Sequence, residues 1–224
     1  MTALPPEFYD RPVVEVARDL LGCTLEHAGA AGVIVETEAY HESEPACHAF
    51  VGLTPRTRTL FGPPGRAYVY RSYGIHALFN AVCEREEVGA AVLIRALEPT
   101  AGIEAMRARR PSSSRDRLRG QPMREVDLCS GPGKLTQALG ISLQHNEGDL
   151  CSGDVRIGPP AAGWANPPVV AGARIGITRA VDLPWRFSVA GNPHVSRPRP
   201  PAGEVEGLTI GRRSPRSGLP PRRR

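Results

Sequence analysis

The spacing of apolar side chains predicts a helix near the start of the chain. Apolar residues recur every three or four positions between 13 and 21, which gives a helix one buried face. Pro12 is tolerated in the first turn of a helix, and Gly22 is the type of residue at which a helix ends. The predicted apolar face consists of Val13, Val16, Ala17, Leu20 and Leu21.

Period-two alternation predicts strands through much of the remaining sequence. The segments CTLEH (23–27) and GVIVETEAY (32–40) read as two strands that follow one another through a Gly-rich turn. Strands that outnumber helices and follow each other through tight turns indicate the α+β class, with an antiparallel sheet, flanking helices and a protruding hairpin. Further strands are predicted at 67–70, 74–83, 90–99, 173–180 and 185–189, and further helices at 103–110 and 131–139.

One face of the strand at 32–40 carries unusual chemistry. Alternation places Ile34, Glu36, Glu38 and Tyr40 on the same side. Taken alone, the segment ETEAY favours a solvated sheet face, because a buried carboxylate is costly unless it is paired or its charge is used. The phenol of Tyr40 beside the two acids favours a pocket wall instead.

A second group of aromatic residues lies in YVYRSYG, residues 68–74. Tyr68 and Tyr70 face the same side of a strand, where core packing and a functional role are equally open. Tyr73 falls at the tip of the predicted hairpin and has no core to enter. Stacking on a base, wedging between base pairs and an oligomer contact are the uses open to it.

The 224 residues suffice for one large domain or two small ones. We expect a folded domain over 1–196, a polar surface loop over 111–124 and a disordered Pro/Arg-rich tail over 197–224. The tail carries a formal +6, and the preceding residues sum to about −1. Any nucleic-acid surface on the domain must therefore be a local patch.

Several classes of protein and site do not fit the sequence. No apolar segment approaches the ~20 residues that span a bilayer, and the N-terminus lacks the features of a signal peptide, so we expect a soluble cytoplasmic protein. Five scattered cysteines predict buried free thiols rather than zinc binding or disulfides. His41, His48 and His76 are too irregularly spaced to predict a metal site.

Six motifs follow one another along the chain. They are ETEAY, the following His48, TPRTRTLF (54–61), YVYRSYG through Asn80, VLIRALEP (92–99) and CSGPGKLTQAL (129–139). In this order, and together with the segments RIGITRA and WRFSV, they resemble the alkyladenine (3-methylpurine) DNA glycosylase family. The resemblance runs from Phe8 to Ser196 and implies a compact single domain on a curved antiparallel sheet.

The resemblance implies an enzyme that flips alkylated or deaminated purines out of double-stranded DNA and hydrolyses the N-glycosidic bond. The product is an abasic site on an intact strand, because Lys134, the only lysine, is expected to lie away from the pocket. We expect a monomer in the bacterial cytosol that needs no metal and no redox cofactor.

The same resemblance assigns roles to individual residues. Glu38 is the general base that deprotonates water, Arg95 helps to hold that water and the target phosphate, and the backbone carbonyl of Ile175 also contacts the water. His76 departs from the aromatic residue expected at its position. The flipped base is enclosed by Tyr40, His48 and Tyr70, with Tyr73 as the wedge in the duplex and Asn80 as the side chain that disfavours the guanine amino group.

Two alternatives from other classes compete with this hypothesis. A non-catalytic nucleic-acid binding module gains nothing from Glu38, because a carboxylate repels phosphate. A glycosidase acting on sugars needs two cooperating carboxylates, which Glu36 and Glu38 would supply only if they converge.

Overall fold

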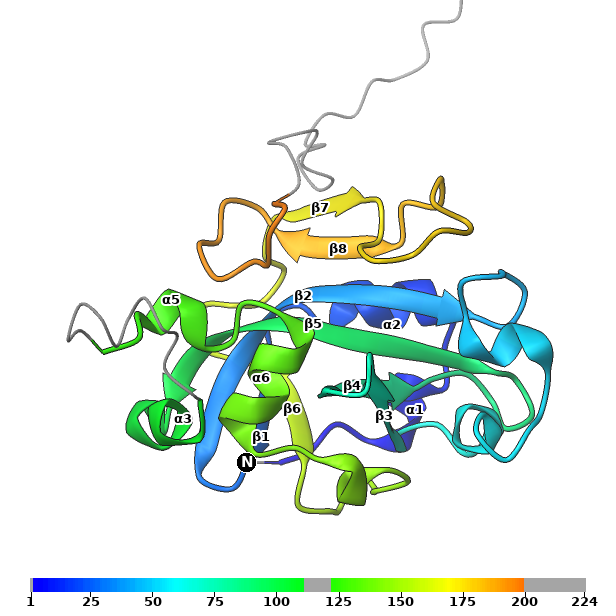
Figure 1. Cartoon of the computed structure of the whole chain (residues 1–224), viewed down its shortest axis with the longest axis horizontal. Helices are drawn as coiled ribbons and strands as arrows, with labels where there is room; N and C mark the ends of the chain where they lie inside the picture. Colours follow the sequence, from blue (N-terminus) through cyan, green and yellow to red (C-terminus); the bar gives the residue numbers. More distant parts are fainter. Residues whose placement is uncertain (1, 111–121, 200–224) are drawn as a thin grey trace, which may run out of the picture.

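The computed structural model describes residues 2–110 and 122–199. The expected tail from 200 onward and most of the expected surface loop, 111–121, lie outside the described residues. Eight antiparallel strands form an open sheet with the order β3-β4-β5-β2-β1-β6, to which β8 adds on β2 and β7 on β8 (Figure 1). The strands are β1 Cys23–His27, β2 Ala30–His41, β3 Ala67–Ser72, β4 His76–Val82, β5 Ala90–Ala101, β6 Arg156–Pro160, β7 Val169–Gly172 and β8 Arg186–Val189.

Short helices flank this sheet, which confirms the α+β class. In Figure 1, α6 lies in front of the sheet and α2 behind it. None of the described helices is long and apolar enough to cross a membrane. The helices are α1 Pro6–Tyr9, α2 Val13–Asp19, α3 Ile103–Arg109, α5 Glu125–Leu128, α6 Pro132–Leu139 and the 3₁₀ turns η1 His48–Val51, η2 Arg58–Phe61 and η3 Leu143–His145.

The predicted first helix is confirmed as α2. Its apolar face is buried, as the spacing requires, and contributes to the main hydrophobic core. The hydroxyl of Thr37 on β2 donates to the carbonyl of Ala17 at 2.7 Å, which places Thr37 on the side of the sheet that faces α2. Glu38, the next residue, therefore faces the opposite side, and Glu36 shares that side because both carboxylates bond to Arg95.

Strand β2 lies in the interior of the sheet, because it pairs along both of its edges. One edge pairs with β5 from Ala31 to His41, while the other pairs first with β1 and then, from Glu36 to Glu38, with β8. Register shifts on either side of Glu36 interrupt the alternation. Ile34, which precedes these shifts, is completely buried in the main hydrophobic core.

Two sequence expectations about strands have different outcomes. The hairpin is confirmed, because β3 and β4 pair from Ala67 to Ser72 around the tip residues Tyr73, Gly74 and Ile75. The strand predicted over 173–180 is wrong, because the segment is irregular. Its backbone cannot join β2, since β8 already occupies that edge.

Candidate functional site

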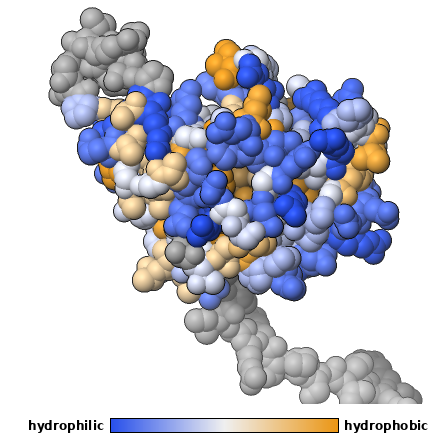
Figure 2. All heavy atoms as spheres, turned by 90° about the horizontal axis from the view of Figure 1, so that it is seen from below, coloured by the Kyte–Doolittle hydropathy of each residue, from blue (hydrophilic) through white to orange (hydrophobic). Residues whose placement is uncertain are grey.

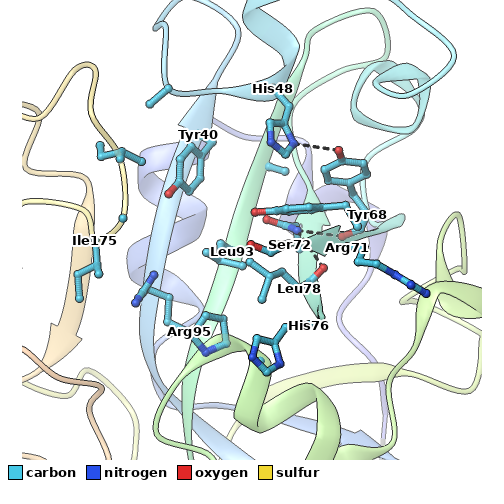
Figure 3. Close-up of a pocket in the computed structure, with 18 of the residues that line it drawn as sticks. Tyr40, His48, Tyr68, Arg71, Ser72, His76, Leu78, Leu93, Arg95 and Ile175 are labelled. Atoms are coloured by element: carbon cyan, nitrogen blue, oxygen red, sulfur yellow. Dashed lines mark hydrogen bonds between the residues drawn. The ribbon is translucent and has the colours of Figure 1, made fainter. Parts of the chain in front are cut away.

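A cavity of about 600 Å³ opens between β2, the β3–β4 hairpin, the 175–177 segment and the start of α6. This volume is typical of pockets that hold a small molecule. Figure 3 shows side chains from several strands pointing into it. Its rings are Tyr40, His48, Tyr68, Tyr70, Tyr73 and His76, its basic side chains are Arg56, Arg71, Arg95 and Lys134, and Asn80 and Ile175 are among the other residues that line it.

Glu38 lies one layer behind this wall. It has no exposed surface, yet three groups that line the cavity donate to its carboxylate. The Tyr40 hydroxyl and Arg95 Nη1 donate to Oε2 at 2.8 and 3.1 Å, and the Ile175 amide donates to Oε1 at 2.7 Å. The expected neighbours of Glu38 are thus brought together, although Ile175 contacts the carboxylate through its N–H, whereas its carbonyl was expected to contact the water.

Glu36 is also completely buried, so a solvated face for the two acids is wrong. Its Oε1 accepts from Arg95 Nε at 3.0 Å, from Arg186 Nε at 2.7 Å and from the Ser196 hydroxyl at 2.9 Å. Its Oε2 accepts from the Ser196 amide at 2.8 Å. Arg95 therefore bridges both carboxylates, and its Nη2 also donates to the Ser196 hydroxyl at 3.4 Å.

The two carboxylates differ in their electrostatics. Burial raises the pKa of Glu38, and this exceeds the opposing effects of Arg95, the Ile175 amide and the Tyr40 hydroxyl. Burial alone would also raise the pKa of Glu36, but Arg95, Arg186 and the Ser196 hydrogen bonds outweigh it and lower that pKa. Glu38 is consequently the better proton acceptor of the pair.

Stacked aromatic rings form the other side of the cavity. The rings of Tyr68 and Tyr70 stack at 5.4 Å, and His48 meets Tyr70 edge-on at 4.7 Å. The Tyr68 hydroxyl lies 3.0 Å from His48 Nδ1, as Figure 3 shows. Burial, followed by the charge of Arg56, lowers the pKa of His48, which favours the neutral imidazole.

Tyr40 connects the aromatic wall to the acids. Burial, reinforced by Glu38, raises the pKa of its hydroxyl, so the phenol keeps its proton and acts as a donor. The Arg174 guanidinium lies 4.6 Å from the centre of the Tyr40 ring. Arg174 also forms a buried ion pair with Glu44, at 2.6 and 2.9 Å, which fixes the start of the 174–177 segment.

The hairpin tip is the most exposed part of the site. Tyr73 is 89% exposed and has a φ of 48°, and Ile75 is 74% exposed. Behind the tip, a Cβ added at Gly133 would lie 2.8 Å from the His76 ring. The close approach of His76 to α6 thus requires glycine at 133.

Two further expectations concern Asn80 and Lys134. Asn80 lines the cavity, and its Nδ2 donates to the Tyr68 carbonyl at 2.9 Å. The expectation that Lys134 lies away from the pocket is wrong. Lys134 is part of the cavity wall, where its Nζ donates to the Ser130 hydroxyl at 3.2 Å.

Comparison with known proteins agrees with the chemistry of this cavity. The family model described as "Methylpurine-DNA glycosylase (MPG)" matches residues 7–193. The chain belongs to the methylpurine-DNA glycosylase family. It is therefore a DNA glycosylase, a hydrolase of N-glycosyl bonds, and a DNA repair enzyme.

Relatives named "Putative 3-methyladenine DNA glycosylase" cover nearly the same residues. The protein of Bradyrhizobium diazoefficiens is 53% identical over 86% of this chain and 90% of its own length. The protein of Granulibacter bethesdensis is 51% identical over 88% of this chain and 89% of its own. That of Methanoculleus marisnigri is 47% identical over 87% of this chain and 98% of its own.

Four contributors to this glycosylase site had no role assigned to them from the sequence resemblance. Glu36, Arg174 and Arg186 carry charges whose partners lie far away in the sequence. Arg56 lines the cavity from the TPRTRTLF motif, which carried the resemblance but received no role. Only the acid-rich face of β2 signalled that buried cations had to be nearby.

Proposed function

We propose that the enzyme flips an alkylated purine out of double-stranded DNA and hydrolyses its N-glycosidic bond with a water molecule deprotonated by Glu38. The observation that carries the proposal is the buried Glu38 carboxylate, which three groups of the cavity wall hold in place. A carboxylate offers about four acceptor positions. Oε2 accepts two of the donors named above and Oε1 accepts one, which leaves Oε1 able to accept from water.

The bond changes of this reaction balance without a further co-reactant. The water oxygen bonds to C1′ of the sugar while its proton passes to Glu38. The N-glycosidic bond breaks, and its electron pair leaves with the purine. An N-alkylated purine that carries a positive charge departs as a neutral base, so it needs no general acid.

The cavity wall suits such a base. The faces of Tyr40 and Tyr70 attract a cationic ring, and stacking offsets part of the cost of leaving the duplex. The neutral state of His48 avoids adding a charge that would repel the ring. Neutral deaminated purines gain less from the aromatic rings, and we propose them as weaker substrates.

Tyr73 would fill the space that the flipped nucleotide leaves. A ring at the exposed tip of a hairpin can enter a base stack with little rearrangement of the sheet. Arg56, Arg71 and Lys134 at the cavity wall would neutralise nearby phosphates. Arg95 is already committed to Glu36, Glu38 and Ser196, so its first role would be to orient Glu38 and the water.

A base-release assay tests the proposal directly. Four duplexes, identical except for one 3-methyladenine, 7-methylguanine, hypoxanthine or etheno-adenine, are incubated with excess enzyme. We expect release of the methylated purines at the highest rates. Failure to release either methylated purine, although the duplexes are bound, would contradict the proposal.

A further inference from the structure

Glu36 has two guanidinium partners, although one would balance the charge of a single buried carboxylate. It is completely buried and accepts from four donors, which come from β5, from β8 and from Ser196. Arg95 and Arg186 both bond to Oε1. Removing one partner from such a group leaves an uncompensated buried charge.

The position of Arg95 depends on this carboxylate. Glu36 binds Arg95 Nε, whereas Glu38 binds Nη1 of the same guanidinium. Two anchors on different nitrogens of a planar group fix its orientation as well as its location. With Glu36 absent, only Glu38 and the weaker contact with the Ser196 hydroxyl at 3.4 Å would hold Arg95.

Glu36 also determines how the positive charge is shared. Arg95 and Arg186 face Glu36 and Glu38, so two buried cations balance two buried anions. If residue 36 were neutral, Glu38 alone would face the full attraction of Arg95. A carboxylate held by an unshared guanidinium is a weaker base.

We propose that Glu36 is a positioning residue for base excision, which fixes the Arg95 guanidinium and shares its charge so that Glu38 remains able to accept a proton. This inference rests on the proposed role of Glu38. Glu36 itself touches neither the substrate nor the water. It also connects the site to the 196–198 segment, because Arg186 Nη2 donates to the carbonyls of Ser196 and Pro198 at 3.3 and 2.9 Å.

The test compares Glu36→Gln with wild type under single-turnover conditions. Glutamine keeps the size of the side chain but removes its charge. We expect base release at neutral pH to fall roughly ten- to hundredfold, as for other losses of alignment, while the affinity for lesion DNA changes little. The acidic limb of the pH–rate profile should move to lower pH, because Glu38 loses the repulsion of Glu36 and receives all of the Arg95 attraction.

The other groups around Glu38 remain in this variant, so the shift is specific. They are Tyr40 on β2, Arg95 on β5, Tyr70 on β3, Arg186 on β8 and, in the 174–177 segment, Arg174 and the Ile175 amide. Glu98→Gln is a matched control, since Glu98 lies on β5 and accepts from Asn192 without contacting Arg95. It should leave both the rate and the acidic limb unchanged.

Glu36→Asp covers the case in which Glu36→Gln does not fold. Aspartate keeps the negative charge on a side chain that is one methylene shorter. The acidic limb should therefore lie near that of wild type even if the rate is reduced. An unmoved limb in Glu36→Gln, with any loss of rate matched by a loss of folded enzyme, would overturn the inference. Retained turnover in Glu38→Gln would instead overturn the proposed function, so the two failures are distinguishable.

Discussion

Glu36 and Glu38 show that neighbouring carboxylates can differ through their surroundings alone. They lie on the same face of one strand and are equally buried. Glu36 faces two guanidiniums and has a lowered pKa, whereas burial dominates at Glu38 and raises its pKa. Divergence of this kind typically separates a structural anion from a general base.

The raised pKa of Glu38 leads to a prediction about pH. Glu38 accepts a proton only when ionised, so base release should fall as the pH drops through its pKa. Because that pKa is raised, the fall should occur at a higher pH than an ordinary glutamate would give. Single-turnover rates measured across pH test this, and a rate independent of pH down to the ordinary range of glutamate would be the contrary result.

Lys134 leads to a prediction about the product. It is the only lysine and lines the cavity, so its amine is the side chain to test for Schiff-base chemistry. Its Nζ is held by the Ser130 hydroxyl, and the proposed nucleophile is water. We expect borohydride to trap no protein–DNA adduct and the abasic strand to stay intact. An adduct that disappears in Lys134→Ala would show lyase activity instead.

The sequence predicted which residue types form the site better than it predicted which side chains they contact. Tyr40 beside the acids of ETEAY correctly indicated a pocket wall, whereas Glu36 and Glu38 are buried behind that wall. The ion pairs of Glu36 with Arg186 and of Glu44 with Arg174 join residues more than 100 positions apart. No local pattern encodes such pairs, because the sheet topology brings them together.

Among the elements of the site, the β3–β4 hairpin depends most on local sequence signals. Alternation and a three-residue tip define it, so the sequence predicted it well. The 173–180 segment was mispredicted because RIGIT has the alternation of a strand. The Ile175 amide donates to the Glu38 side chain rather than to the backbone of a neighbouring strand.

The exposed tip leads to a prediction about base flipping. Flipping a nucleotide costs a few kcal/mol of unstacking. Tyr73→Ala removes the ring that would stabilise the flipped state against this cost. We expect excision to fall roughly tenfold or more in a stable duplex and much less where the lesion is mismatched or single-stranded. Tyr73→Phe, which keeps the ring, should behave like wild type. Equal losses on all substrates would argue against a wedge.

The Arg174–Glu44 pair leads to a prediction about stability. Arg174→Met leaves Glu44 as an uncompensated buried carboxylate, a loss of about 3–5 kcal/mol. The melting temperature should fall, and base release should fall further than the loss of folded enzyme explains, because the Ile175 amide loses its fixed position. Thermal melting and active-site titration measure the two effects. A normal rate per folded molecule would contradict this role for the pair.

In the whole molecule, the formal charge differs between the C-terminal residues and the rest of the chain. The face seen in Figure 2 is mostly hydrophilic and is broken by separate apolar patches. Arg56, Arg71 and Lys134 are gathered at one cavity, within residues 1–196, whose formal charges nearly cancel. Alternation predicted the fold class, whereas the order of strands depends on long-range pairing that alternation does not encode.

The arginine-rich C-terminus leads to a prediction about DNA affinity. Residues 200–224 contain six arginines and two glutamates, which can neutralise phosphates without reading sequence. Deleting them should weaken binding to undamaged duplex and reduce its salt slope by up to roughly five. Single-turnover base release should be unchanged. Identical slopes with and without these residues would leave them without a role in DNA binding.

In the proposed reaction, Glu38 takes the proton from the attacking water. The most direct test of this role measures lesion-duplex affinity and single-turnover base release for Glu38→Gln beside wild type. Glutamine is nearly isosteric but cannot accept the proton, so affinity should stay within about threefold while base release falls by roughly 10²- to 10⁴-fold. Release at close to the wild-type rate would contradict the claim.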